Sequence, residues 1–258
     1  MSSQRVIKNK HKTKISILGI IKQIAVWIFS IFYMPLLIIS CMVVSRQRRS
    51  SLGPRMTRGW GLGVVTLAGV KIKYTDRARV ALSERKARVL TFNHGSTLDV
   101  PVGAALLPDG GVLALKAEMK TMPILGAGCV ALGSIFLDRA NRENAYATLQ
   151  ESAERIQNET LQVLISPEGT RSSDGQLGRF KLGAFHLAYE ANVPILPIVL
   201  HGPTEIWPRG QLAPFGGTVT IDVLSELIVT DKKPEIIRTT ADQLRELYLQ
   251  ALTKPTSM

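Results

Sequence analysis

The sequence contains few of the residues that thiol, disulfide or metal chemistry needs. Its two cysteines, Cys41 and Cys129, lie in apolar surroundings and away from any motif, so we expect neither a disulfide framework nor a thiol nucleophile. The four histidines form no cluster with cysteine, aspartate or glutamate at the spacing of metal ligands. We therefore expect no metal and no other cofactor.

Acidic residues are absent from the first 75 positions, and this absence divides the chain. Of 32 lysines and arginines, 13 precede Asp76, the first acidic residue, whereas basic and acidic residues almost balance from there onward. A nucleic-acid-binding domain would spread basic and aromatic side chains over its folded surface. Here the basic residues flank an apolar segment, which argues against nucleic acid as a partner and in favour of membrane lipid.

That apolar segment extends without a charge from Gln23 to Ser45, between Lys22 and Arg46. At about 1.5 Å per residue, a helix of this length could cross a hydrocarbon core of about 30 Å. Pro35 near its middle favours a kink or break, and the nearly balanced basic flanks give no orientation by the positive-inside rule. We therefore expect a re-entrant hairpin in one leaflet, at the cytoplasmic face of the inner membrane, rather than a single span. The run is long for a cleaved signal peptide, and no small-residue cleavage pattern ends it.

Downstream of this segment, short apolar runs alternate with stretches of helical periodicity. Seven runs are typical of strands, namely residues 70–74, 88–92, 111–115, 134–137, 161–165, 195–200 and 219–223. Strands interleaved with helices predict an α/β fold, with a mostly parallel sheet flanked by helices and an N-terminal helical membrane anchor. We expect residues 1–60 to form the basic membrane-anchoring segment and residues 61–258 to form one catalytic domain.

Residues 93–99, Asn-His-Gly-Ser-Thr-Leu-Asp, connect a predicted buried strand to an apolar helical stretch. On a regular helix, His94 and Asp99 would be rotated by about 140° from each other. They can meet only if His94 lies in the turn and Asp99 in the first helical turn, with Ser96 or Thr97 as the N-cap. Asp99 would then accept a hydrogen bond from one ring nitrogen of His94 and leave the other nitrogen as a general base.

Three further blocks follow, at residues 133–139 (Gly-Ser-Ile-Phe-Leu-Asp-Arg), 167–172 (Pro-Glu-Gly-Thr-Arg-Ser) and 193–199 (Val-Pro-Ile-Leu-Pro-Ile-Val). Arg139 ends one apolar strand and Arg171 follows another, and a planar guanidinium suits a phosphate group. Between them, Gly169 lets the backbone approach a ligand and Thr170 offers a hydroxyl. Because the ends of parallel strands meet at one edge of a sheet, these residues predict an anion site there.

The four blocks, in this order and spacing, resemble the glycerolipid acyltransferase family, in particular the bacterial 1-acylglycerol-3-phosphate acyltransferases. The resemblance covers roughly residues 69–199 and implies that His94 and Asp99 are catalytic, with direct attack by the acceptor hydroxyl and no acyl-enzyme. It implies a substrate-binding set of Asn93, Ser96, Lys116, Arg139, Glu168, Gly169, Thr170, Arg171 and Lys181. Within this set we expect Arg139 to contact phosphate and Glu168 to bind a glycerol hydroxyl or orient Arg171. Backbone amides near Gly95 are the expected oxyanion donors.

The predicted function is transfer of a fatty acyl group from acyl-CoA or acyl-carrier protein to lysophosphatidic acid, which gives phosphatidic acid. Two alternatives stay open at this point. The same fold could act on another acceptor, such as a lysophospholipid, lyso-ornithine lipid or glycerol-3-phosphate, because the motifs are shared among those enzymes. The other alternative is a non-catalytic, membrane-tethered protein that binds anionic lipid through its N-terminal charge.

Overall fold

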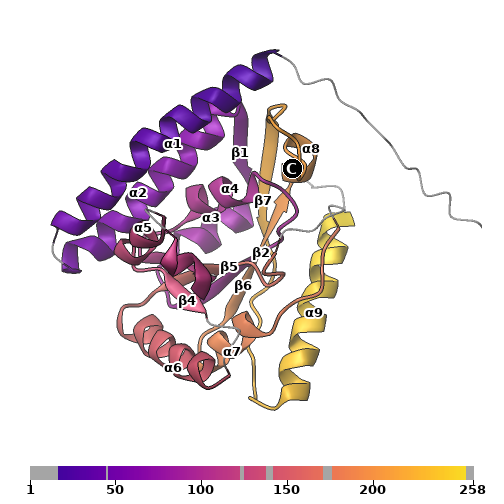
Figure 1. Ribbon diagram of the computed structural model, residues 1–258. Coiled ribbons are helices and arrows are strands. Elements are labelled where there is room, and N and C mark those ends of the chain that lie inside the picture. The colour runs from indigo at the N-terminus through magenta and orange to yellow at the C-terminus, as the bar shows by residue number, and fades with distance from the viewer. Residues whose placement is uncertain (1–16, 45, 123–124, 138–141, 171–175, 254–258) are drawn as a thin grey trace, which may run out of the picture.

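A seven-stranded sheet forms the centre of the computed structural model, which describes residues 17–44, 46–122, 125–137, 142–170 and 176–253 (Figure 1). Its strands are β1 (Val70–Tyr74), β2 (Arg88–Phe92), β3 (Gly111–Lys116), β4 (Ile135–Leu137), β5 (Gln162–Ile165), β6 (Ile195–His201) and β7 (Gly217–Val223). Their order is β1-β7-β6-β2-β5-β3-β4, and β6–β7 is the one antiparallel pair among the described strands. The predicted mostly parallel sheet is confirmed, and each predicted strand is found within two residues of its expected ends.

Helices cover both faces of this sheet, because its central strands carry apolar side chains on both sides. Val89 of β2 packs into one core cluster, whereas Leu90 and Phe92 of the same strand pack into the other. The first cluster includes residues of α6 (Arg142–Asn158), α7 (Gly183–Glu190) and α9 (Pro234–Thr253), and the second includes residues of α2 (Arg46–Leu67), α3 (Asp76–Ser83) and α4 (Asp99–Leu106). Strands buried on both faces are continuous apolar runs in the sequence. The remaining elements are α1 (Ile17–Val43), the 3₁₀ helix η1 (Ala117–Thr121), α5 (Leu125–Ala131) and α8 (Pro203–Ile206).

The N-terminal apolar segment is one continuous helix, α1, which contains Pro35 and continues past it. The predicted break at Pro35 is therefore wrong. Packing on both sides holds the helix together, because Val26 before the proline and Leu37 and Cys41 after it are buried. The other face of α1 exposes most of its large apolar side chains, and the helix is long and apolar enough to cross a membrane. It is a candidate membrane anchor.

The chain folds back after α1, and α2 lies antiparallel along it (Figure 1). The Tyr33 hydroxyl donates to the carbonyl of Met56 at 3.0 Å, and the Trp60 indole N–H donates to the Ser30 hydroxyl at 3.1 Å. On its other side α2 packs against α4, where Gly61 lies directly on the α4 backbone. The boundary expected between residues 60 and 61 thus falls inside a helix that belongs to both the anchor and the sheet domain.

The contact at Gly61 gives a first prediction. A Cβ at this position would lie 2.4 Å from the amide nitrogen of Ala105 and 2.5 Å from the carbonyl oxygen of Pro101. Because these are main-chain atoms of α4, they cannot shift without moving the helix, so Gly61→Ala should push α2 away from α4. We expect a loss of about 1–3 kcal/mol of unfolding free energy from overpacking, against about 1 kcal/mol regained in helix propensity.

Thermal unfolding in detergent measures this effect, and Thr66→Ala, at an exposed position of the same helix, is the matched control. A Gly61→Ala protein as stable as the control would show that α2 does not need this close approach.

Candidate active site

The turn between β2 and α4 brings the two predicted catalytic side chains together. His94 Nδ1 lies 3.1 Å from Asp99 Oδ2, and Asp99 is the first residue of α4, as predicted. The N-cap prediction is wrong, because Leu98 holds that position and no side chain caps it. Instead, the Ser96 hydroxyl, two residues before the N-cap, accepts the amide of Leu98 at 3.0 Å. The Phe92 ring packs edge-on against the imidazole, with 5.7 Å between the ring centroids.

The Asp99 carboxylate is only 1% exposed, and a buried charge of this kind needs hydrogen-bond donors. The amide of Ser96 donates to its Oδ2 at 2.7 Å. Burial raises the pKa of Asp99 above its usual value, while hydrogen bonds from His94, Ser96 and Gly95 oppose that rise. Because a carboxylate can only accept, His94 Nδ1 carries the proton and Nε2 is the acceptor nitrogen. Within the described part of the chain no group bonds to Nε2, so a ligand could donate to it.

His94 lines a groove of about 290 Å³ at the carboxyl end of the central strands. Its lining is Asn93, His94, Gly95, Glu168, Gln176, Leu177, Leu200, His201, Gly202, Thr204, Glu205 and Leu252. The volume is suited to a head group and a reacting ester rather than to a whole lipid. Among the described residues, no group of three or more His, Cys, Asp or Glu side chains could hold a metal ion.

One wall of the groove was missed by sequence reasoning. It comes from the end of β6 and from α8, and includes His201, Thr204 and Glu205. His201, for which the sequence predicts no role, is the last residue of β6 and is half-buried. Burial lowers the pKa of His201, and the carboxylates of Asp222 and Glu205 oppose that change. One feature of the sequence could have identified His201. It lies at the end of a predicted buried strand, which places it at the same sheet edge as His94.

Glu168 follows β5 and supports the catalytic turn from the neighbouring strand. Its Oε1 accepts the amide of His94 at 2.6 Å, and its Oε2 accepts the amide of Gly178 at 2.7 Å. The side chain is 4% exposed, and burial raises its pKa while these two amide bonds oppose the rise. Both oxygens thus accept a backbone amide, and Glu168 also lines the groove. Its expected contact with a glycerol hydroxyl or with Arg171 stays a prediction, because Arg171 lies outside the described residues.

The expected oxyanion donors near Gly95 stay a prediction, but most backbone amides around this residue bond within the protein. The amide of His94 donates to Glu168, and the amides of Gly95 and Ser96 interact with Asp99. The amide of Thr97 donates to the carbonyl of Trp207 at 3.3 Å. The amides of His94, Ser96 and Thr97 thus donate to acceptors of the protein itself and hold the shape of the turn.

Asn93 and Ser96, both predicted to bind substrate, have structural hydrogen bonds that hold the turn in place. The Asn93 side chain donates to the carbonyl of Leu200 at 3.0 Å and accepts the amide of Leu200 at 2.8 Å, so it pairs with β6 much as a strand would. The Ser96 hydroxyl is fully buried and lies 2.9 Å from the carbonyl of Pro203 and 2.7 Å from that of Trp207. Their polar groups tie the catalytic turn to β6 and α8.

The other predicted substrate-binding residues lie at the same sheet edge or outside the described residues. Gly169 follows β5 with a positive φ of 68°, a conformation that favours glycine, and Thr170 after it is exposed. Lys116 ends β3, and Lys181 is exposed in the loop that leads to α7, two residues before the helix begins. Arg139 and Arg171 lie outside the described residues, so the predicted anion site stays a prediction.

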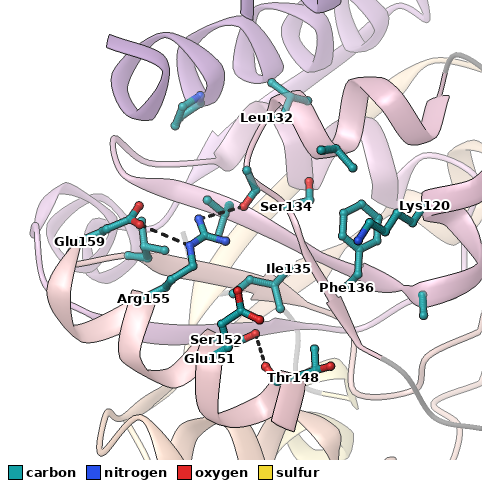
Figure 2. Close-up of a pocket in the computed structure, with 16 residues that line it drawn as sticks. Lys120, Leu132, Ser134, Ile135, Phe136, Thr148, Glu151, Ser152, Arg155 and Glu159 are labelled. Atoms are coloured by element: carbon teal, nitrogen blue, oxygen red, sulfur yellow. Dashed lines mark hydrogen bonds and ion pairs between the residues drawn. The ribbon is translucent and has the colours of Figure 1, made fainter. Parts of the chain in front are cut away.

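A larger hollow, of about 780 Å³, lies elsewhere, beside the edge strand β4 (Figure 2). Figure 2 shows Ile135 and Phe136 of β4 on one side and α6 residues on the other, including Glu151 and Arg155. The Arg155 guanidinium closes one end, because it bonds to Glu159 and to the carbonyl of Gly133, both at 3.3 Å. No predicted catalytic or substrate-binding residue of the described chain lines this hollow, so its size does not make it the reaction site.

With this geometry established, comparison with known proteins identifies the family. The family model described as Acyltransferase matches residues 71–201, which is just over half of the 258 residues. The chain belongs to the acyltransferase family. The matched region contains His94, Asp99, Arg139, Glu168 and Arg171 and ends at His201, the wall of the groove.

The curated relatives compared with this acyltransferase are named as 1-acyl-sn-glycerol-3-phosphate acyltransferases. The sequence is 32% identical over 161 residues to the 1-acyl-sn-glycerol-3-phosphate acyltransferase alpha of Ovis aries, covering 62% of this chain and 56% of that one. It is 29% identical over 188 residues to the 1-acyl-sn-glycerol-3-phosphate acyltransferase of Saccharomyces cerevisiae, covering 72% and 61%. The chain thus spans about 60% of the length of the curated relatives it matches.

A solved structure shares the whole fold of the acyltransferase. The crystal structure of the 1-acyl-sn-glycerophosphate (LPA) acyltransferase PlsC from Thermotoga maritima superposes with a TM-score of 0.73 at 19% sequence identity. The match covers 93% of this chain and 98% of that one. An alignment of this extent includes the paired N-terminal helices as well as the sheet, which confirms the fold.

Proposed function

We propose that this acyltransferase moves a fatty acyl group from acyl-CoA or acyl-carrier protein to the free hydroxyl of lysophosphatidic acid, giving phosphatidic acid. The observation that carries the proposal is the 3.1 Å hydrogen bond between His94 and Asp99, at the mouth of a groove at the sheet edge. The names of the curated relatives supply the acceptor, since they are 1-acyl-sn-glycerol-3-phosphate acyltransferases.

In the proposed reaction, His94 Nε2 removes the proton of the acceptor hydroxyl while its oxygen attacks the thioester carbonyl carbon. Asp99 stabilises the imidazolium that forms. The tetrahedral intermediate then collapses, the carbon–sulfur bond breaks, and the departing thiolate takes the proton from Nε2. No acyl-enzyme is required. In support, neither serine nor cysteine is among the described residues that line the groove, and the Ser96 hydroxyl is buried against two carbonyls.

The acceptor's phosphate gives a testable consequence of the sequence motifs. We expect Arg139→Ala and Arg171→Ala each to raise the KM for lysophosphatidic acid about 10- to 150-fold with a smaller change in kcat, because a charge-assisted contact contributes about 1.5–3 kcal/mol. Steady-state kinetics with a fixed acyl donor measures this. An unchanged acceptor KM in both variants would remove the proposed anion site.

The acceptor itself is tested with the full-length protein in membranes, one labelled thioester and a panel of lysolipids. We expect lysophosphatidic acid to be acylated with the highest kcat/KM. Faster turnover of a lysophospholipid, lyso-ornithine lipid or glycerol-3-phosphate would assign the enzyme to that acceptor instead. Absence of transfer to every acceptor would favour a non-catalytic lipid-binding protein.

We further propose that the protein associates with the membrane through α1 and remains on the cytoplasmic side. The exposed apolar face of α1 and the fold-back of α2 support this arrangement. Cysteine labelling of intact and permeabilised cells at positions Lys10 and Arg55 should find both accessible from the cytoplasm. Labelling of the two positions from opposite sides would establish a single span.

A further inference from the structure

The segment between α8 and β7, residues 207–216, is called here the 207–216 loop. It exposes two large apolar side chains, Leu212 at 72% and Phe215 at 41%. Other apolar residues of the loop are buried, since Trp207 and Ala213 pack inward. Arg209 is exposed on the same short segment. Exposed apolar side chains beside a basic residue, on an otherwise well-packed loop, are typical of a surface that meets a lipid head-group region.

This loop lies against the candidate anchor helix. A Cβ at Gly216 would be 3.2 Å from Lys22 Nζ and 2.9 Å from the carbonyl oxygen of Gly69, so the α1 ammonium group lies beside the end of the loop. In Figure 1 the first turns of α1 reach over the start of β7. The same turns expose the apolar side chains of Ile17, Leu18, Ile20, Ile21 and Ile24. The 207–216 loop of the sheet domain therefore ends beside the first turns of α1, which expose apolar side chains.

The loop is also tied to the catalytic turn. The Trp207 carbonyl accepts the Ser96 hydroxyl at 2.7 Å and the Thr97 amide at 3.3 Å, and Ser96 forms an isolated β-bridge with Pro208. Shortly before the loop, Gly202, Thr204 and Glu205 line the groove. A surface that binds the 207–216 loop therefore also sets the distance between that surface and His94.

We infer that the 207–216 loop is a second membrane contact, which inserts Leu212 and Phe215 into the interface of the bilayer beside α1. This inference rests on the proposed membrane association. The occupant is lipid because the loop ends beside the first turns of α1, whose exposed apolar side chains no described element of the protein covers. Its role is to position the groove so that a lysolipid can present its hydroxyl to His94 without leaving the membrane.

The test attaches a nitrobenzoxadiazole dye to Leu212→Cys in the full-length protein, where Cys41 and Cys129 are buried. Vesicles of equal parts phosphatidylcholine and phosphatidylglycerol should shift the emission to the blue, and nitroxide lipids labelled near the head group should quench it. The matched control is Ile228→Cys, which is 69% exposed and follows Leu227 at the opposite end of β6. We expect its emission to stay unchanged.

Co-sedimentation with the same vesicles shows whether a negative result contradicts only the loop contact or also the proposed membrane association. A protein that sediments while the Leu212 dye behaves like the Ile228 dye overturns the loop contact alone. A protein that stays in the supernatant overturns the membrane association and the loop contact with it.

Activity provides an independent measurement. The double variant Leu212→Gln with Phe215→Gln should lose turnover several-fold on lysophosphatidic acid in vesicles and retain it on acceptor dispersed in detergent micelles. Ile228→Gln should change neither. Equal turnover of the double variant and the parent protein on vesicles would overturn the positioning role.

Discussion

Replacing His94 by alanine is expected to lower acyl transfer by about 10²- to 10⁴-fold, the usual contribution of a positioned general base. The variant should fold normally, because the imidazole is at the rim of a groove and its side chain bonds within the described chain only to Asp99. Asp99→Ala should have a similar effect, since without the carboxylate nothing fixes the tautomer of the ring. Initial rates with lysophosphatidic acid and one labelled thioester measure both variants.

The matched control is His186→Ala, at a half-buried position in α7 that does not line the groove. It should retain full activity, and all three variants should still sediment with membranes. Substantial activity in the purified His94→Ala or Asp99→Ala protein would refute the assigned base.

Glu168→Ala should be the second most damaging change, although this side chain bonds only to backbone groups in the described structure. Its removal leaves the amides of His94 and Gly178 without acceptors, at about 1–3 kcal/mol each. The catalytic turn then loses its support from β5, and a shift of His94 by about 1 Å can cost roughly 10²-fold in rate. We expect kcat to fall about 10²-fold with a smaller change in the acceptor KM.

Two conservative variants distinguish support of the turn from substrate binding. Glu168→Gln keeps one carbonyl oxygen as an acceptor, so it should recover part of kcat relative to alanine. Glu205→Gln changes an exposed carboxylate of the same groove and should have little effect. A Glu168→Ala enzyme with normal kcat and a raised acceptor KM would contradict the supporting role and would instead indicate that Glu168 binds substrate, as expected from the sequence.

Much of the sheet could be predicted because its strands are buried on both faces. The run of residues 195–200 is apolar throughout, and residues 161–165 are apolar except for Gln162, a pattern typical of a strand covered on both faces. The His94 and Asp99 contact could also be predicted, because five residues across a strand-to-helix turn leave one way for them to meet. Both predictions depend on residues that are close in sequence.

Other features could not be predicted from local pattern. Helix α2 contains four glycines and Pro54, which disfavour helix in isolation, and its glycines instead allow close contact with Tyr33, Phe29 and the α4 backbone. The task of Glu168 depends on His94, which is 74 residues away in the sequence. The side chains of Asn93 and Ser96 find their partners more than 100 residues downstream. Such contacts depend on which strands are neighbours in the sheet, and the order of the strands cannot be read from the spacing of the motifs.

The supports of the catalytic turn have a consequence for how the enzyme matures. Its amides and side chains are held by Glu168, Leu200, Pro203 and Trp207, which are synthesised well after the turn itself. Long-range contacts of this kind form late, since the intervening chain must first close into the sheet. In a nascent or partly folded chain the His94 turn therefore lacks these supports, and we expect the gain of activity on refolding to report that the last strands have docked.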